Sequence, residues 1–464
     1  DKEGARIMRY RYRTEDELKD SGVEWLGKIP KDWEVGKFKY SSLLYTGNSI
    51  KDNEKDNYTD SENSYPYIST KDINIDYNTI NYDNGMYTKV DDKTFKIANK
   101  DSILICIEGG SAGRKISYLN QNVSFVNKLC CIQSNKIDSK YQYYYCNSDS
   151  FKKEFSLNMS GLIGGVSVSA LNNFRLVNPS LFEQEKIANF LDEKTSQFDL
   201  IISKKEKLIE RLEEAKKSLI SEVVTGKVKV VKTDDGYELV KRSSEEMKAS
   251  GVEWLGEIPN DWDVSKIKYE CDINARIGWK ALKADEYVEE GYIFLATPNI
   301  KGKDIDYKNV NYITKERYDE SPEIKLKVDD VLLTKDGSTL GTVNVVRKLE
   351  REATVNSSIA VVRPFENLNG IYLNYFIKSN YMQSIIGMFK DGMGVPHLFQ
   401  SDIKLFNVLL PKIKEQTIIS EYLDINIDLI ENMKSKAILQ IEKLKEAKQS
   451  LISEAVTGKI EILD

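Results

Sequence analysis

Histidine is almost absent from this chain, because His397 is the only one among 464 residues. A Ser-His-Asp or Cys-His catalytic arrangement needs a histidine beside its nucleophile, and a histidine-rich metal site needs several. A single histidine therefore argues against both kinds of chemistry. Carboxylates are abundant, so acidic pairs that arise by chance carry little meaning.

Cysteine is scarce and scattered. None of the five cysteines forms a Cys-x-x-Cys pair, so the ligand spacing of a zinc site is absent. An odd, dispersed set is typical of buried thiols in the reducing cytoplasm, where we expect this protein to reside. The five are Cys106, Cys130, Cys131, Cys146 and Cys271.

Long apolar runs are missing too. No stretch of about 18 apolar residues occurs, so we expect no membrane span. The N-terminal residues lack the apolar segment of a signal peptide. We expect the seven residues before Met8 to be foreign to the natural chain, and they do not enter the fold argument.

Positive charge is not in surplus. The chain has 67 Lys and Arg against 73 Asp and Glu, for a net charge of −6. A basic balance is the usual footprint of phosphate binding, although binding faces are local and partners can supply many contacts. The acidity argues against a protein that holds DNA tightly by itself.

Motifs of DNA-modifying chemistry are also lacking. An adenine methyltransferase needs an Asn-Pro-Pro-aromatic run, and the nearest string, residues 177–180 (VNPS), lacks the second proline and the aromatic residue. No glycine-rich cofactor loop follows a predicted strand. We therefore expect a non-catalytic chain with no catalytic residues, no metal and no cofactor of its own.

What the sequence does contain is a repeat. Residues 21–40, SGVEWLGKIPKDWEVGKFKY, return as residues 250–269 with 15 of 20 positions identical, and we call these two segments the frame elements. Residues 209–227 return as residues 441–459 with 15 of 19 identical. The sequences between the matched blocks are almost unrelated. Two equivalent frames with different contents suit a two-part recognition device.

Two long helices are predicted from stretches without proline or glycine. Between Leu181 and Val224, apolar residues recur mostly at spacings of three, four or seven, the period of a helix or coiled coil. A second helix is predicted from Glu415 to Val456, and about 42 residues give a rod of roughly 60 Å. Each apolar stripe needs a partner, so we predict that the helices pair antiparallel and hold two globular regions apart.

Between the frame elements and the helices, both halves read as short strands and turns. Examples are residues 65–70, 102–108 and 115–119, and we expect at least one helix near residues 141–155. The predicted fold class is α+β. It has two similar globular α/β regions, separated by a pair of long antiparallel coiled-coil helices, with a pseudo-two-fold internal repeat.

The two globular regions share weak landmarks. Residues 109–113 (GGSAG) align with residues 337–341 (GSTLG), and residues 125–127 (FVN) with residues 354–356 (TVN). The first glycine run is not a nucleotide-binding GxxxxGK[ST] loop, and no helix is expected after it. A tight hairpin turn is favoured there, and a loop lying against DNA is the alternative. One fold with divergent loops indicates one task on two targets.

The tandem SGVEWLGxIPxDWxV elements, the Glu-Gln pairs that follow Pro179 and Pro411 into each long helix, and the SLISEVVTGK and SLISEAVTGK ends resemble one family closely. It is the specificity subunit of type I restriction–modification enzymes. The resemblance covers nearly the whole chain from about residue 9. The globular regions match only in outline, as that family's target recognition domains do.

The resemblance implies a domain order. Residues 9–180 form the first target recognition domain, 181–230 the central spacer helix, 231–249 a linker, 250–411 the second target recognition domain, and 412–464 the second spacer helix. It also implies a DNA-recognition subunit that reads a bipartite, asymmetric target in double-stranded DNA. Two methyltransferase subunits, each with S-adenosylmethionine, would dock on the helices. Whether two restriction subunits also join stays open.

Polar and basic side chains in the shared loops are the candidate DNA contacts, because Lys and Arg suit phosphate or guanine and Asn suits adenine. For His397, a hydrogen-bonded surface histidine is the alternative. In the first domain the candidates are Thr70, Lys71, Ser111, Arg114, Lys115, Gly164 and Ser167. In the second they are Lys280, Thr297, Asn299, Lys335, Ser338, Thr339 and His397.

Two other functions are weighed against this one. A single-chain restriction–methylation enzyme would carry a methyltransferase motif, which these 464 residues lack. A coiled-coil scaffold with ligand-binding β domains would fit the acidic charge, and salt-dependent binding to one DNA sequence would exclude it.

Overall fold

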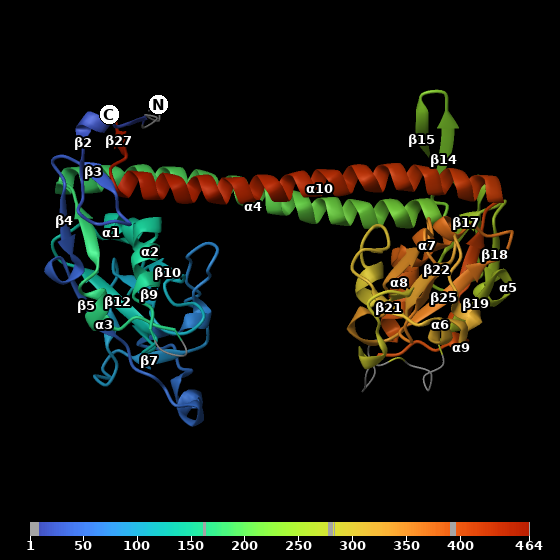
Figure 1. Cartoon of the computed structure of the whole chain (residues 1–464), viewed down its shortest axis with the longest axis horizontal. Helices are drawn as coiled ribbons and strands as arrows, with labels where there is room; N and C mark the ends of the chain where they lie inside the picture. The colour runs from blue at the N-terminus through green and yellow to red at the C-terminus, as the bar shows by residue number, and fades with distance from the viewer. Residues whose placement is uncertain (1–8, 161–163, 277–281, 283, 390–395, 464) are drawn as a thin grey trace. The chain divides into compact units, whose positions relative to one another are not determined.

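The computed structural model describes residues 9–160, 164–276, 282, 284–389 and 396–463. The chain forms two compact units: unit 1 is residues 1–206 with 438–464, and unit 2 is residues 207–437. Each unit holds one globular region and a segment of both long helices, α4 (Leu181–Val224) and α10 (Ile413–Val456), as Figure 1 shows. The predicted helix bounds agree with these to within two residues.

The globular region of unit 1 contains two four-stranded sheets. The first is antiparallel, with the strand order β10-β9-β12-β5. The second has the order β7-β6-β11-β8, and β6 and β11 run parallel. The bounds are β5 Ser42–Thr46, β9 Ile103–Cys106, β10 Ile116–Tyr118 and β12 Leu129–Ser134, then β6 Ser64–Ile68, β7 Tyr87–Lys89, β8 Ile97–Ala98 and β11 Val123–Phe125.

Unit 2 repeats this plan with different residues. Its antiparallel sheet has the order β19-β25-β22-β23, and its second sheet, β21-β20-β24, again contains one parallel pair, β20 with β24. The bounds are β19 Cys271–Ala275, β22 Val331–Thr334, β23 Val343–Val345, β25 Ile359–Pro364, β20 Tyr292–Leu295, β21 Asn311–Ile313 and β24 Ala353–Val355. The predicted α+β class with an internal repeat is confirmed.

Three short helices of unit 1 have counterparts in unit 2, where the described residues also form α5 (Ile267–Glu270) and α6 (Lys315–Asp319). Side-chain caps begin several of them, for example Ser148 before α2 and Ser379 before α8. The expected helix near residues 141–155 is two helices, α1 and α2. The bounds are α1 Ser139–Cys146, α2 Asp149–Leu157 and α3 Val168–Leu171 in unit 1, and α7 Gly370–Lys378, α8 Asn380–Met388 and α9 Gln400–Leu405 in unit 2.

Strands from the frame elements tie each globular region to the start of its long helix. In unit 1, β4 (Glu34–Lys37) pairs with β13 (Arg175–Asn178), directly before α4. In unit 2, β18 (Asp263–Lys266) pairs with β26 (Asn407–Leu410), directly before α10. The indole N–H of Trp33 then donates to Glu183 at 3.2 Å, and that of Trp262 to Glu415 at 3.1 Å. The repeated Trp and Glu of the sequence therefore meet in the same way in both units.

Inside each unit, α4 and α10 run antiparallel. Polar contacts join residues whose numbers rise along one helix as they fall along the other. In unit 1, Lys448 Nζ lies 2.7 Å from Asp199 Oδ1 and Lys205 Nζ lies 2.6 Å from Gln440 Oε1. In unit 2, Lys216 Nζ lies 2.5 Å from Glu431 Oε1, and Lys434 pairs with Glu213. The predicted antiparallel pairing is confirmed within each unit.

The segment expected to be a linker, residues 231–249, is structured. β14 (Val228–Thr233) and β15 (Gly236–Lys241) form a hairpin around Asp234-Asp235, and β16 (Met247–Ala249) pairs with β17 (Glu257–Pro259). Two aspartates followed by Gly236 are typical of a turn, and Val230 of the first strand is buried. Charge at the exposed positions hid this pattern.

In unit 1, two strands that are far apart in the sequence pair as β14 and β15 do in unit 2. β1 (Tyr10–Tyr12) pairs antiparallel with β27 (Ile460–Ile462), which follows α10 as β14 follows α4. The core of unit 1 accordingly joins Val456 and Ile460 to Trp33 and Tyr141. Both β1 and β27 thus belong to unit 1.

Candidate nucleic-acid interface

A glycine turn connects two antiparallel strands at the same place in both globular regions. In unit 1 it is residues 109–113, between β9 and β10, and Gly113 N donates to Cys106 O at 2.8 Å. In unit 2 it is residues 337–341, between β22 and β23, and Gly341 N donates to Thr334 O at 2.9 Å. The alignment of the two turns and the hairpin interpretation are confirmed.

A second segment lies against each glycine turn. Glu108 forms a single β-bridge with Gly165, and Asp336 forms the equivalent bridge with His397. Gly109 N donates to Gly164 O at 3.0 Å, while Gly337 N donates to Pro396 O at 2.9 Å. Each bridge brings a residue far along the chain to the glycine turn, so two separate loops form one surface.

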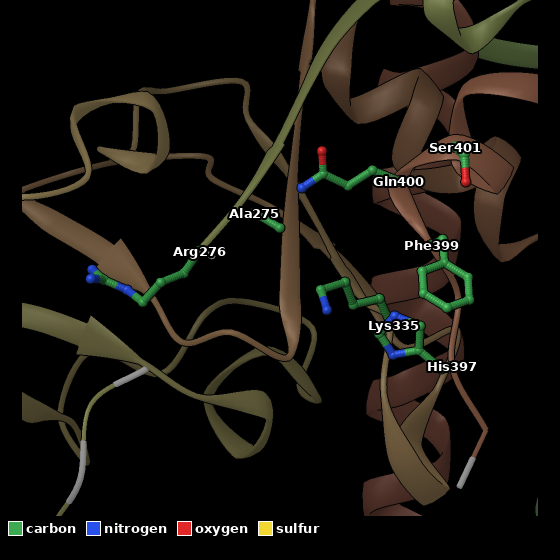
Figure 2. Close-up of a pocket in the computed structure, with 7 residues that line it drawn as sticks. All are labelled: Ala275, Arg276, Lys335, His397, Phe399, Gln400 and Ser401. Carbon is green, nitrogen blue, oxygen red and sulfur yellow. The ribbon is translucent and has the colours of Figure 1, made fainter. Parts of the chain in front are cut away.

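In unit 2 this surface encloses a pocket of about 420 Å³ (Figure 2). His397 Nδ1 contacts the Asp336 carboxylate, and Lys335 Nζ lies 3.1 Å from the same carboxylate. Figure 2 shows the Lys335 amine and the Gln400 amide both directed away from Phe399. The pocket thus presents hydrogen-bond donors and acceptors beside an exposed aromatic ring. The lining residues are Ala275, Arg276, Lys335, His397, Phe399, Gln400 and Ser401.

Aromatic and carboxylate contacts fix His397 in this pocket. Its ring meets that of Phe399 edge-on, with centroids 4.3 Å apart, while Asp336 holds Nδ1. Because one ring nitrogen is occupied by Asp336, the other is the one that can meet a ligand. The alternative was a hydrogen-bonded surface histidine. His397 does contact Asp336, but it is half-buried.

Arg276 is a lining residue that sequence reasoning missed. It is only 3% exposed, and its guanidinium lies 5.7 Å from the centre of the Phe294 ring. Its Nη2 has no hydrogen-bond partner in the part of the chain that the structure describes. Burial, followed by the nearby charge of Arg317, lowers the pKa of Arg276. Nothing in the local sequence marks it, because its surroundings come from distant strands.

The candidates of the first domain gather around the turn only in part. Arg114 and Lys71 are exposed, and Lys115 Nζ donates to Thr70 O at 2.6 Å. Ser167 caps α3 by accepting from Ala170 N. Thr70 opens a short 3-10 turn whose preceding Ser69 bonds the Asp72 carboxylate. Gly164 and half-buried Ser111 belong to the two segments that meet at the turn.

In the second domain, Lys335, Ser338, Thr339 and His397 lie on or beside the same glycine turn. Lys280 lies outside the described residues. Asn299 is placed differently from the expectation, because it is 6% exposed and its amide serves a turn. It accepts from Ala296 N and donates to the carbonyls of Asp306 and Asn309. Its amide is therefore occupied internally, whereas the half-buried Thr297 beside it is partly accessible.

A second candidate surface lies on the long helices. Ile425, Leu429 and Met433 of α10 are 49%, 56% and 52% exposed, and they are spaced four residues apart on one face of the helix. In unit 1, Leu200 and Ile201 of α4, with Ile438 and Leu439 of α10, are exposed as well. Rows of exposed apolar residues on a helix are typical of a surface that binds another protein.

The described residues offer little for other chemistry. Within them, no group of three or more His, Cys, Asp or Glu side chains is placed to hold a metal ion. No helix among them has the length and apolar character that a membrane span requires. All five cysteines are free thiols and buried.

The family model for the type I restriction modification DNA specificity domain matches this chain twice, over residues 30–213 and 259–443. The chain belongs to this family. Each match begins in a frame element and ends within a long helix, so the family domain coincides with one repeat of the chain. The resemblance seen in the sequence is therefore confirmed.

Relatives match over almost the full length. The MjaVIII specificity subunit of Methanocaldococcus jannaschii is 28% identical over 444 residues, which cover 94% of each chain. The putative MjaX specificity subunit of the same organism is 25% identical and covers 94% of this chain and 96% of its own. Both are named as specificity subunits of type I restriction enzymes, so the whole chain, and not one repeat alone, has counterparts.

Solved structures share the fold. A chain from a study of complex assembly and conformational transition of the type I R-M system matches with a TM-score of 0.69 and 14% identity, covering 93% of this chain and 99% of that one. The HsdS subunit from Thermoanaerobacter tengcongensis matches with a TM-score of 0.51 and 15% identity, covering 93% and 98%. At these identities the likeness concerns the fold.

Proposed function

We propose that this chain is the DNA-reading subunit of a type I restriction–modification system, and that each globular region reads one half of a split target. The observation that carries the proposal is one fold built twice with different side chains at equivalent loop positions. The equivalent pairs are Ile107 and Lys335, Gly110 and Ser338, Arg114 and Thr342, and Gly165 and His397.

These differences are chemically suited to reading different bases. Lys and Arg recognise the acceptors of guanine or a phosphate, and amides such as that of Gln400 pair with adenine. Replacing a glycine by a histidine at one bridge changes both the shape and the hydrogen bonding of the surface. Two loops with the same backbone and different side chains therefore favour two different half-sites.

The net charge of −6 is compatible with this role when partners share the phosphate contacts. The exposed apolar residues of α4 and α10 support docking of two methyltransferase subunits on the helices. Each would bring S-adenosylmethionine, and this chain would contribute recognition without catalysis. Two restriction subunits could join the same assembly.

The paired helices would set the distance between the half-sites. A separation of about one DNA turn, roughly 34 Å, fits a spacer of this length. Four residues inserted into the first helix would shift the gap by about 6 Å, or one to two base pairs. A recognised gap that stayed unchanged after such an insertion would contradict this part of the proposal.

The test is methylation mapping by long-read sequencing in cells that co-express the chain with its cognate methyltransferase subunit. The expected result is a new split motif with methyladenine on opposite strands at a fixed gap. An assembled complex that produces no motif would contradict sequence-specific reading. Failure of any complex to form would contradict the docking role and favour the scaffold function.

A further inference from the structure

A cavity of about 530 Å³ lies in unit 2, where the globular region meets α4 and α10. Its walls include the C-terminal end of α7, the residues that close the glycine turn, and one face of each long helix. Figure 1 shows α7 beneath the two helices. Six cationic side chains line it: Lys216, Lys301, Lys303, Arg347, Lys378 and Lys434.

Four of these six cations are paired with carboxylates. Arg347 makes two hydrogen bonds of 2.7 Å to Asp424, and Lys216 lies 2.5 Å from Glu431. Lys303 pairs with Asp428, and Lys434 with Glu213. Within the described ranges, no carboxylate is in ion-pair distance of Lys301 or Lys378. Arg347 has a second carboxylate, Asp304, at 3.8 Å, so Lys301 and Lys378 are the two cations of this lining that have no carboxylate of their own among the described residues.

Lys378 is the more confined of the two. It is the last residue of α7, it is half-buried, and its Nζ lies 5.8 Å from the centre of the Tyr375 ring. Burial, followed by the positive charges of Lys216 and Arg347, lowers the pKa of Lys378 to about 8. The carboxylates of Asp424 and Asp304 act in the opposite direction, and a further anion beside Lys378 would favour its charged form.

We propose that this cavity binds a phosphate group, with Lys378 and Lys301 as the residues that neutralise it. A phosphate carries up to two negative charges and several acceptor oxygens, which match two unpaired ammonium groups with three donors each. A single carboxylate would neutralise only one of them. The phosphate can come from a DNA backbone, which rests on the proposed function, or from a free phosphate ion, which does not.

The equivalent cavity of unit 1 is smaller and has no lysine at the position of Lys378, although Arg114 and Lys152 line it. It measures about 190 Å³, and Asn147, the residue before the Ser148 cap of α2, takes the place of Lys378, the residue before the Ser379 cap of α8. Lys448 lies 2.7 Å from Asp199 there, and Lys152 donates to Gln449 at 2.8 Å. The lysine at this position is therefore particular to unit 2, and the chain itself supplies the residue for a neutral replacement.

The test is competitive labelling of the purified full-length chain with an amine-acetylating reagent at pH 8, read by mass spectrometry. Inorganic phosphate is compared with chloride at matched ionic strength. Bound phosphate would raise the pKa of Lys378 by about one unit and lower its labelling about fivefold. Lys308, an exposed lysine of the same unit outside the cavity lining, is the internal control. Equal responses of Lys378 and Lys308 would overturn the proposal.

Two variants extend the test to thermal unfolding. Lys378→Asn, which copies unit 1, should abolish the phosphate-dependent rise of the unfolding midpoint, and Lys308→Asn should retain it. Lys301 is an exposed residue of the cavity lining, so Lys301→Asn replaces Lys378→Asn in this test if Lys378→Asn does not fold. A rise that persists in Lys378→Asn or in Lys301→Asn would also overturn the proposal.

The two sources of phosphate are separated by the salt dependence of binding to the mapped DNA target. If a backbone phosphate occupies the cavity, Lys378→Asn lowers the slope of log affinity against log salt by about one. An unchanged slope, together with phosphate protection of Lys378, assigns the site to free phosphate. Absence of any methylation motif would contradict the proposed function while leaving the labelling result intact.

Discussion

Gly458, where α10 ends, packs against Trp33 of the first frame element, so that a Cβ atom at position 458 would lie 2.9 Å from Trp33 Cζ3. Gly226 at the end of α4 meets Trp262 of the second frame element in the same way, at 3.1 Å. The long helix of each repeat therefore ends on the frame element of the other repeat. The strong matches at the two ends of each repeat are the two sides of this contact.

A side chain at Gly458 should destabilise unit 1. Gly458 has φ +73°, and a Cβ there would also lie 2.4 Å from Pro30 Cδ, so Gly458→Ala combines backbone strain with a clash. Gly27→Ala, at φ +67° with nothing within 4 Å, carries the strain alone. We expect a loss of about 1 kcal/mol for Gly27→Ala and a further 1 to 3 kcal/mol for Gly458→Ala by urea unfolding. Equal losses of unfolding free energy in the two variants would show that the contact of Gly458 with Pro30 and Trp33 does not contribute to stability.

Because of Glu154, unit 1 should be more stable in mild acid than at neutral pH. Burial raises the pKa of Glu154 to about 7, although hydrogen bonds from Arg175 N, at 2.9 and 3.1 Å, act in the opposite direction. A raised pKa means that the folded state binds the proton more tightly. This stabilisation is complete below about pH 4.5 and is lost as the pH rises to 7, by at most about 3 kcal/mol.

Glu154→Gln should therefore flatten the dependence of unfolding free energy on pH between 5 and 7. Ile385 occupies the equivalent position of α8, which shows that the fold accepts a neutral residue there. Glu185→Gln, at an exposed position of α4, removes the same charge and should leave the pH dependence as it is. If the unfolding free energy of Glu154→Gln still depended on pH between 5 and 7, another titrating group would be responsible.

Lys335 and His397 should affect recognition of one half-site only. Both line the pocket beside the glycine turn of unit 2, so Lys335→Ala or His397→Ala should weaken or relax reading of that half by about 1 to 3 kcal/mol. Methylation mapping of each variant measures this directly. Lys348→Ala, an exposed lysine paired with Glu350, is the control. Altered reading of both halves would contradict the assignment of one globular region to one half-site.

Leu429 and Met433 should be needed for assembly and not for folding. Both are more than half exposed on α10, so Leu429→Glu or Met433→Glu should abolish co-purification with the methyltransferase subunit while the unfolding midpoint stays nearly constant. Ser435→Glu, at an exposed polar position of the same helix, should co-purify normally. Intact assembly of both apolar-to-charged variants would place the docking surface elsewhere.

The long helices were predictable because their signal is local. Proline and glycine are absent from 181–224 and from 415–456, and the apolar period leaves one interpretation. The hairpin of β14 and β15 was missed because charged residues lie among its apolar ones, of which only Val230 is buried. The alignment of Phe125 with Thr354 was wrong by one residue, because Phe125 pairs with Ile68 as Val355 pairs with Leu295.

The candidate site was only partly predictable, because two distant segments build it. The glycine turn, Lys335 and His397 were identified from sequence, whereas Asp336, Arg276 and Gln400 were not. Their roles depend on the bridge between residues 336 and 397, which no local pattern reveals. Asn299 has the side chain of a DNA contact, but a turn requires its amide.

The most direct test of the central claim is methylation mapping of a symmetrised chain, in which residues 41–174 replace residues 270–406. The exchange joins equivalent positions, because Tyr40 and Tyr269 end the frame elements and Arg175 and Asn407 begin β13 and β26. If each globular region reads its own half-site, the new motif carries the first half-site on both strands around a fixed gap. A methylated motif that keeps the original second half would contradict the account.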